Sequence, residues 1–315
     1  MLRMLVITSL LLTGGLVMAQ NDGFTDHGIC AAVAESRGVV VTHTESGKNL
    51  AITCATDCSP RGYILVTDLD SGETQQLFYP EGVANSDPFA SLMSRNGRFY
   101  TGAGPAFLEY DPDSGEWLFG KVINPKASCY VGSAIADGPG ELIWKGTYPD
   151  CRLYSYDPQT QEVVDYGQMD EEEHYFSYLV FDSAGWAYAG IGTARQNIVA
   201  FNPQTRERKQ MVDEAERVVG TALVYTGVDG KVYGRAGSQW YRLFAGEREA
   251  IPDSEKAAAA PTGSIGWGLT SGTLPDGRRI TVNLPDSWLE VTDPKAGETR
   301  RIELAYDGGG VSLTS

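Results

Sequence analysis

The stretch LYSYDPQTQEVVDYG, from Leu153 to Gly167, joins an apolar segment to a second β-forming segment through the turn sequence Asp-Pro-x-Thr. Proline fixes φ at one turn position, and an Asp or Asn side chain can accept a hydrogen bond from the backbone two residues further on. The stretch therefore predicts a tight hairpin between two strands.

The same phrase recurs along the chain. Its other copies are LVTDLDSGETQQLFY (Leu65–Tyr79), FLEYDPDSGEWLFG (Phe107–Gly120), IVAFNPQTRERKQMV (Ile198–Val212) and LEVTDPKAGETRRIEL (Leu289–Leu304). The turns begin at Asp68, Asp111, Asp157, Asn202 and Asp293, at intervals of 43, 46, 45 and 91 residues. Because the last interval is twice the others, we expect a degenerate copy near Leu243–Glu249, where the Asp-Pro pair is missing.

A period in the forties with several short strands in each unit is typical of a β-propeller. Each unit divides into four strands, A to D. Glycine pairs such as the Asn-Gly of SRNGRFY form the A–B turn, and the recurring phrase forms the C–D turn. The chain has 37 Gly and 15 Pro and no sustained helical periodicity; SEKAAAAP (Ser254–Pro261) is expected to be a loop or one helical turn. We predict an all-β fold, a β-propeller of about six to seven four-stranded blades.

The repeat also predicts the domain organisation. The propeller is expected over residues 37–315, with blades at residues 37–84, 85–126, 127–171, 172–214, 215–260 and 261–306 and a partial unit at 307–315. A propeller needs its first and last blades to meet, because open sheet edges invite association. Either residues 20–36 and 307–315 complete a closing blade, or the chain is a piece of a larger propeller. The end of the sequence within a repeat favours an incomplete propeller.

The first residues have the features of an export signal. Arg3 is followed by the apolar stretch MLVITSLLLTGGLVM, and Val17-Met18-Ala19 is a small-residue cleavage site. We expect a signal peptide over residues 1–19, cleaved after Ala19, no membrane span after cleavage, and a secreted or periplasmic protein. The whole chain has a formal net charge of −16, so it lacks the basic surface that a nucleic-acid-binding protein needs.

Disulfides are the first interpretation of cysteines in an exported protein. Of the five cysteines, Cys54 and Cys58 flank one B–C loop, and Cys129 and Cys151 fall at the same end of the next blade but one. We therefore expect Cys54–Cys58 and Cys129–Cys151 disulfides that hold loops of one face, with Cys30 left over. The alternative is that several of them are buried free thiols.

The B–C loops and the connections from one blade to the next (D–A) share one face of a propeller, called here the loop face. Polar and aromatic residues are expected to converge there. Arg195 and Arg235 suit a carboxylate or phosphate group, and Tyr148, Tyr175 and Trp267 suit stacking on a sugar or another flat ligand. The predicted ligand-binding residues are Tyr130, Asp150, Tyr175, Arg195, Arg235, Trp267 and Asn283, and the candidate catalytic residues are His174 and Tyr148.

Each of these residues also has a structural interpretation. The arginines can pair with acidic loops, the tyrosines can pack between blades, and His174 can be a solvated loop residue. The acidic run Asp170–Glu173 is interpreted as a solvated loop, with a weak calcium site as the alternative. No metal site is predicted, because the three histidines lie far apart in the sequence.

The repeats, best seen in YVGSAIADGPGELIWKGTYPDCRLYSYDPQTQEVVDYG (Tyr130–Gly167), resemble the exported bacterial propellers of the YVTN/NHL/Kelch-like group. Within this group, lyases of the virginiamycin B lyase type are similar in fold. That resemblance implies a histidine base and a bound magnesium ion, but only His174 of this chain matches the location. Oligogalacturonate lyase-type propellers use a histidine-rich metal site that this chain does not provide.

Two functions from different classes follow. The first is an exported propeller that binds a ligand or partner, such as a glycan, an anionic small molecule or a protein, on the loop face. The second is a lyase or hydrolase acting on a carbohydrate or lactone-like substrate at that face, with His174 or Tyr148 as base and Arg195 and Arg235 holding an anion. No cofactor follows from the sequence. A third possibility, a sensor module of a longer protein, depends on the reading frame beyond Ser315.

Overall fold

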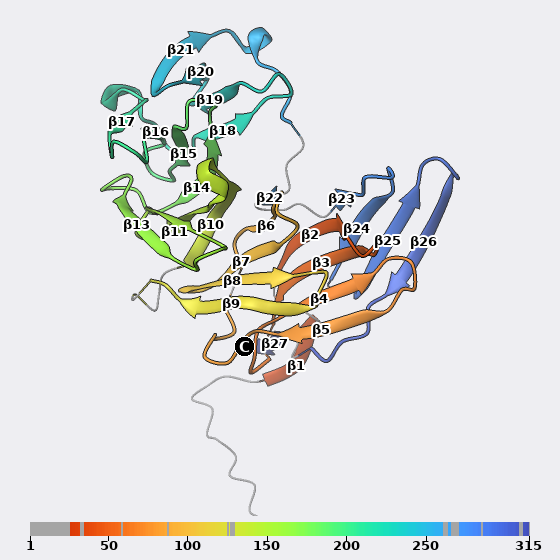
Figure 1. Ribbon diagram of the computed structural model, residues 1–315. Helices are drawn as coiled ribbons and strands as arrows, with labels where there is room; N and C mark the ends of the chain where they lie inside the picture. Colours follow the sequence, from red (N-terminus) through yellow and green to blue (C-terminus); the bar gives the residue numbers. More distant parts are fainter. Residues whose placement is uncertain are drawn as a thin grey trace, which may run out of the picture.

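The protein is described by a computed structural model that covers residues 26–31, 35–57, 59–86, 88–124, 126, 130–260, 264–265, 271–284, 286–308 and 311–314 (Figure 1). The expected signal peptide and its cleavage point lie outside the described residues. Apart from short 3-10 turns, every regular element of the described residues is a β-strand.

Six antiparallel sheets of four consecutive strands follow one another along the chain. The first three are β2 (Glu35–His43), β3 (Asn49–Thr56), β4 (Tyr63–Asp68) and β5 (Thr74–Phe78); β6 (Ser91–Met93), β7 (Phe99–Ala103), β8 (Ala106–Asp111) and β9 (Glu116–Val122); and β10 (Tyr130–Asp137), β11 (Ile143–Tyr148), β12 (Arg152–Tyr156) and β13 (Val163–Gln168).

The last three are β14 (Phe176–Phe181), β15 (Ala187–Ile191), β16 (Asn197–Phe201) and β17 (Arg208–Gln210); β18 (Leu223–Thr226), β19 (Val232–Ala236), β20 (Gln239–Phe244) and β21 (Glu247–Ile251); and β23 (Ser271–Thr273), β24 (Arg279–Asn283), β25 (Trp288–Asp293) and β26 (Glu298–Glu303). The predicted all-β propeller is confirmed, with six four-stranded blades.

Three further strands and three 3-10 turns complete the fold. β22 (Ser264–Ile265) adds to the inner edge of β6 as a fifth strand, and β1 (Asp26–Ala31) pairs with β27 (Val311–Thr314) in a two-stranded sheet. This pairing joins segments from the two ends of the described chain (Figure 1). The 3-10 turns are η1 (Pro139–Glu141), η2 (Glu214–Glu216) and η3 (Asp253–Glu255).

The recurring phrase forms the hairpin between the third and fourth strands of five blades. In each copy the side-chain oxygen of the first turn residue accepts the N–H of the residue two positions on, as expected for this turn chemistry. The distances are 2.9 Å from Asp70 to Asp68, 2.9 Å from Asp113 to Asp111, 2.8 Å from Gln159 to Asp157, 2.9 Å from Gln204 to Asn202 and 2.8 Å from Lys295 to Asp293.

The blade of β18–β21 uses a different hairpin, at the position expected for the degenerate copy. Phe244 pairs directly with Glu247, so the turn consists of Ala245 and Gly246, both with positive φ (50° and 73°). A two-residue turn of this backbone form needs no Asp-Pro pair, because its twist already matches that of the strands.

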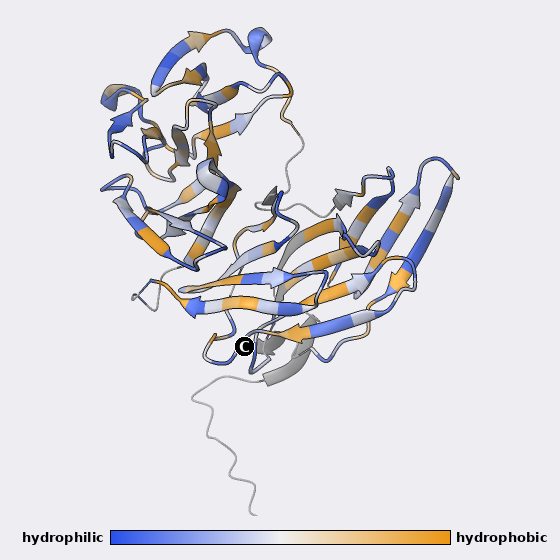
Figure 2. Ribbon diagram, in the orientation of Figure 1, coloured by the Kyte–Doolittle hydropathy of each residue, from blue (hydrophilic) through white to orange (hydrophobic). Residues whose placement is uncertain are grey.

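The sheets pack face to face, which explains their burial. Five hydrophobic clusters join neighbouring blades, in the order β23–β26, β2–β5, β6–β9, β10–β13, β14–β17 and β18–β21. The second and third strands of a blade are covered on both sides, so β7, β15 and β16 are buried along their whole length. In Figure 2 the outermost strand β26 is mostly hydrophilic.

Gly102 illustrates how closely two blades approach. A Cβ atom at this position would lie 1.7 Å from the carbonyl oxygen of Val131 on the next blade, so only glycine fits.

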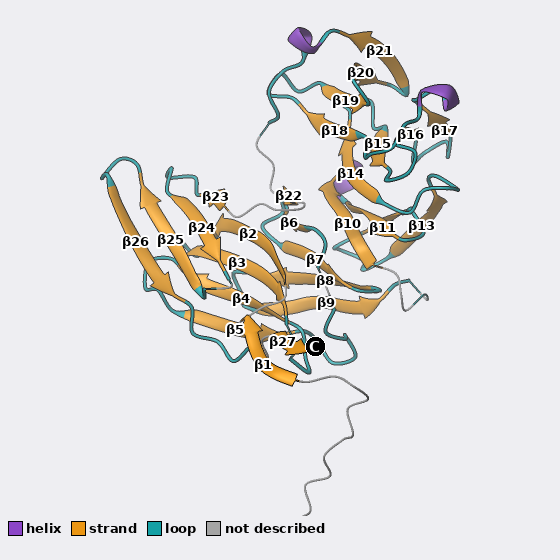
Figure 3. Cartoon of the chain, turned by 180° about the vertical axis from the view of Figure 1, so that it is seen from behind, coloured by secondary structure: helices purple, strands orange, loops and turns teal. Residues whose placement is uncertain are grey.

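Among the described residues no hydrophobic cluster joins the β18–β21 blade to the β23–β26 blade, and the two stand apart in both views (Figures 1 and 3). Within the described chain no helix is long and apolar enough to span a membrane.

Candidate functional site

The loop face carries a row of four aromatic rings, called here the aromatic row: Phe89, Tyr130, Tyr148 and Tyr175. The Tyr148 and Tyr175 ring centroids are 4.2 Å apart, those of Phe89 and Tyr130 are 4.7 Å apart, and those of Tyr130 and Tyr148 are 6.0 Å apart. Phe89 is buried, whereas the three tyrosines are only partly buried. The row therefore consists of three partly exposed phenol rings and the buried ring of Phe89.

The strand register brings these rings together. Tyr130 opens β10 and Tyr148 closes β11, and the two are direct partners in the antiparallel pair. Phe89 lies in the connection that leads into β6, and Tyr175 in the connection that leads into β14. The row thus draws on three successive blades, and the sequence-predicted residues Tyr130, Tyr148 and Tyr175 do lie side by side.

His174 lies next to this row and is exposed. Its Nδ1 is 2.8 Å from the carbonyl oxygen of Pro149, whose peptide bond to Tyr148 is cis. A carbonyl only accepts, so Nδ1 is the donor in this contact, and in a neutral imidazole of this tautomer Nε2 is the acceptor. Burial raises the pKa of Tyr175, and a hydrogen bond with Tyr148 raises it further. Tyr175 is therefore held as a neutral phenol.

Asp150, another predicted ligand-binding residue, is buried beneath the loop. Its carboxylate accepts hydrogen bonds from Asn124 Nδ2 at 3.0 Å and from the hydroxyl of Thr147 at 2.5 Å. Thr147 in turn accepts the N–H of Arg152 at 2.9 Å. These contacts fix the loop between β11 and β12, so Asp150 supports the position of Tyr148.

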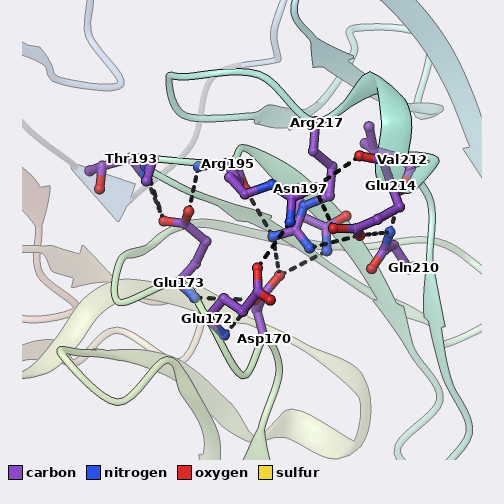
Figure 4. A network of polar contacts seen from close by, with 11 residues as sticks. Asp170, Glu172, Glu173, Thr193, Arg195, Asn197, Gln210, Val212, Glu214 and Arg217 are labelled. Atoms are coloured by element: carbon purple, nitrogen blue, oxygen red, sulfur yellow. Dashed lines mark hydrogen bonds and ion pairs between the residues drawn. The ribbon is translucent and has the colours of Figure 1, made fainter.

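The predicted arginine Arg195 belongs to a network of charges, shown in Figure 4. Its guanidinium forms ion pairs with two carboxylates, that of Glu172 (3.1 Å to Oε2) and that of Glu214. Below it, Arg217 bonds to Asp170 Oδ2 at 2.9 Å, and both side chains are 4% exposed. An arginine that already holds two carboxylates is poorly placed to bind a further anion.

Glu173 and Asp170 are the buried acids of this network. Glu173 accepts the N–H groups of Thr193, at 2.7 Å, and of Ala194 and Arg195 (Figure 4). Burial alone would raise the pKa of Asp170, but hydrogen bonds from Asn197 and from two backbone N–H groups, together with Arg217, hold that pKa below its usual value. The network orders the loop between β15 and β16 (Figure 4).

The remaining predicted residues are placed elsewhere. Arg235 is exposed on β19, where its guanidinium lies 5.4 Å from the ring centroid of Trp240. Asn283 ends β24 and bonds to Asp286 at 2.9 Å within its own loop. Trp267 lies outside the described residues. Arg195 and Arg235 have different partners, so the structure gives no shared anion site formed by the two.

The cysteines differ from the expected pairing. Cys54 and Cys151 are both buried free thiols, and their expected partners Cys58 and Cys129 lie outside the described residues. The two expected disulfides are therefore not seen here. Cys54 faces Ser91 at 3.5 Å, and burial raises the pKa of its thiol to about 11. Burial also raises the pKa of Cys151.

The residues present do not fit a metal centre. Among the described residues, no group of three or more His, Cys, Asp or Glu side chains is placed to hold a metal ion. The acids of the Asp170–Glu173 run bond to separate protein groups: Asp170 to Arg217, Glu172 to Arg195, and Glu173 to backbone N–H groups. These separate partners mean that the Asp170–Glu173 run does not form a calcium-binding loop.

A feature that the sequence analysis missed is a cavity of about 850 Å³ along the propeller axis. The first strands of four blades line it, through Leu92 of β6, Ser133–Asp137 of β10, Ser177–Phe181 of β14 and Leu223–Thr226 of β18. It extends to the A–B turns, which lie on the face opposite to the loop face. None of the predicted site residues lines it. The only signal in the sequence is the series of small residues in SAIAD, Ser133–Asp137.

Comparison with known proteins shows the fold. No protein-family model matches the chain, and no curated protein matches its sequence. Virginiamycin B lyase from Staphylococcus aureus is similar in structure, with a TM-score of 0.50 and 14% sequence identity over 90% of this chain and 89% of that one. The Dos1 propeller matches with a TM-score of 0.51 and 13% identity over the same shares. At this identity the likeness concerns architecture alone: the chain has the β-propeller fold.

Proposed function

We propose that this protein is an exported, ligand-binding β-propeller that holds a glycan or another flat ligand against its aromatic row. The observation that carries the proposal is the pair Tyr148 and Tyr175, whose partly exposed rings lie 4.2 Å apart at one end of the row. Aromatic faces with hydroxyl groups at their edges bind sugar rings by stacking and by hydrogen bonding. Export rests on the signal-like residues 1–19.

The charges around the row favour an uncharged ligand. Glu171 and Glu172 lie in the connection that leads to Tyr175 and are exposed, but both are ion-paired, Glu171 with Arg208 and Glu172 with Arg195, which also binds Glu214. Because these guanidinium groups already hold carboxylates, they are poorly placed to bind an anionic ligand. We therefore place neutral glycans ahead of the anionic small molecules that the sequence also suggested.

A glycan array probed with the mature protein tests this proposal. Tyr148→Ala and Tyr175→Ala are expected to weaken binding to any neutral hit at least tenfold, in keeping with the loss of about 1.4 kcal/mol or more of stacking. Tyr175→Phe keeps the ring and should retain most of the affinity. Phe78→Ala, which removes a 38% exposed ring from the outer strand β5, is the matched control and should leave binding unchanged. Equal binding by wild type and Tyr175→Ala would refute the proposal.

One observation favours a second function, a lyase or hydrolase that uses the same face. His174 Nδ1 is oriented by the Pro149 carbonyl, which leaves Nε2 available as a general base beside the row. Under this alternative, His174→Ala abolishes turnover of an array hit while binding persists. If wild type shows no turnover of any bound glycan, the binding function stands alone.

A further inference from the structure

The axial cavity has a largely apolar wall with room for a small molecule. Among its described lining residues, Ala136 of β10, Tyr178 and Val180 of β14, and Leu223 and Tyr225 of β18 each keep part of their surface uncovered. The volume of about 850 Å³ falls within the range of small-molecule sites. The cavity can therefore cover most of the surface of one apolar molecule.

Several polar side chains of the wall are already bonded within the protein. The Ser133 hydroxyl donates to the Phe176 carbonyl at 2.5 Å, and the Tyr225 hydroxyl donates to the Ala257 carbonyl at 2.8 Å. The Asp182 carboxylate, near the A–B turns, accepts four hydrogen bonds. Water is weakly held beside groups with filled partners, and an apolar molecule gains affinity when it displaces such water.

The charges at the edge of the cavity are also paired. Arg95 is the one Lys or Arg among the described lining residues, and its Nε lies 3.6 Å from Asp137 Oδ2. The Asp137 carboxylate also accepts the hydroxyl of Ser94 and the N–H of Arg95. A charged ligand inside the apolar wall would lose its hydration without gaining a free partner of opposite charge. The lining therefore favours a neutral ligand.

We propose that the axial cavity is a second binding site, which takes a neutral, mainly apolar ring compound that enters from the face of the A–B turns. The rings of Tyr178 and Tyr225 supply aromatic surface for such a compound. None of the four residues of the aromatic row lines the cavity. This site is thus separate from the aromatic row and does not depend on the proposed glycan binding.

Two fluorescent probes that share one ring skeleton test the proposal on the full mature protein. N-phenyl-1-naphthylamine is neutral, and 8-anilino-1-naphthalenesulfonate adds a sulfonate to the same rings. The neutral probe should bind saturably at one site, and about tenfold or more tightly than the sulfonate. Its binding should slow amide exchange in residues 133–137 and 177–181, which line the cavity. This comparison uses the unmodified protein, so it does not depend on the folding of any variant.

Variants then place the site. Ser177→Trp puts an indole into the cavity and should weaken binding of the neutral probe about tenfold or more, because it removes the space for the rings. Thr299→Trp, which adds an indole to the exposed outer strand β26, is the matched control and should have no effect. Tyr148→Ala should also leave probe binding unchanged, which distinguishes this site from the aromatic row.

Four results would each overturn the proposal. They are no saturable binding of the neutral probe, equal or tighter binding of the sulfonate, unchanged amide exchange in both segments, and undiminished binding by a folded Ser177→Trp variant. Loss of probe binding in Tyr148→Ala would move the probe to the aromatic row and would equally contradict an axial site.

Discussion

The ring centroids of Tyr148 and Tyr175 lie 4.2 Å apart with their planes inclined by 34°, although the two residues belong to adjacent blades. Tyr148 ends β11, and Tyr175 lies in the connection into β14. Their contact exists only because the two blades pack face to face through the cluster that contains Leu153 and Phe176. The candidate ligand site is thus a product of blade packing.

Lys145 should limit the stability of the protein. It is completely buried on β11, its Nζ has no hydrogen-bond partner among the described residues, and it lies 3.6 Å from the Phe107 ring centroid. Burial lowers the pKa of Lys145 well below its usual value. The folded state then binds fewer protons than the unfolded state, so the unfolding free energy is reduced at neutral pH and rises as pH increases toward the unfolded pKa of about 10.4.

Lys145→Met should therefore raise the unfolding free energy at pH 7 by about 1–3 kcal/mol and remove this alkaline rise. Urea unfolding between pH 7 and 10 measures both effects. A less stable Met variant, or one with the wild-type pH dependence, would mean that Lys145 is charged and partnered in the native protein.

Glu109 should be a strong contributor to the packing of two blades. Its fully buried carboxylate on β8 accepts hydrogen bonds from Arg98 at 2.7 Å, from Tyr100 at 3.1 Å and, across the interface, from Tyr156 at 2.5 Å. Glu109→Gln loses the charge that strengthens all three bonds and should destabilise the protein by about 2–3 kcal/mol. Tyr156→Phe removes one bond and should cost less. Thermal unfolding of both variants checks the order; a neutral Glu109→Gln would contradict it.

Asp170 should contribute to acid denaturation. The pKa of Asp170 is lower in the folded state than in the unfolded state, where it is about 3.9. The ionised Asp170 therefore adds to the unfolding free energy at pH values above about 3.9, and this stabilisation is lost as pH falls through the folded pKa. Asp170→Asn should be less stable than wild type at pH 7 and lose less stability between pH 5 and 2. Arg217→Met, which removes the ion-pair partner of the buried Asp170, should begin its acid loss at a higher pH. Parallel pH–stability curves for wild type and Asp170→Asn would exclude this role.

Cys54 and Cys151 should react slowly with alkylating reagents in the native protein. Both thiols are buried and their pKa values are raised, so access and thiolate fraction are both low. We expect iodoacetamide to label them at pH 8 only after unfolding, as followed by peptide mass spectrometry. Peptides that remain disulfide-linked without reduction would instead restore the pairing with Cys58 and Cys129.

The fold was predictable because its signals are local. The Asp or Asn at the start of each turn phrase makes the same hydrogen bond two residues on, so one short pattern marks five blades. The antiparallel order also places Tyr130 beside Tyr148 without any knowledge of packing. These inferences depend on contacts within one hairpin or one sheet.

The rest depends on contacts between blades, which leave no comparable pattern. Arg195 follows a glycine-rich strand end, and nothing local shows that Glu172 and Glu214 bind it. The axial cavity forms between the first strands of four blades. β22 pairs with the edge of β6, although the two strands lie far apart in the sequence. Such long-range placement is set by the packing of whole sheets.

A crystal structure of the mature protein with its strongest neutral glycan from the array would test the proposed glycan site on the aromatic row. We expect a sugar ring in van der Waals contact with Tyr148 and Tyr175, with His174 at the edge of the ligand. A glycan bound elsewhere on the propeller, with the aromatic row untouched, would contradict it.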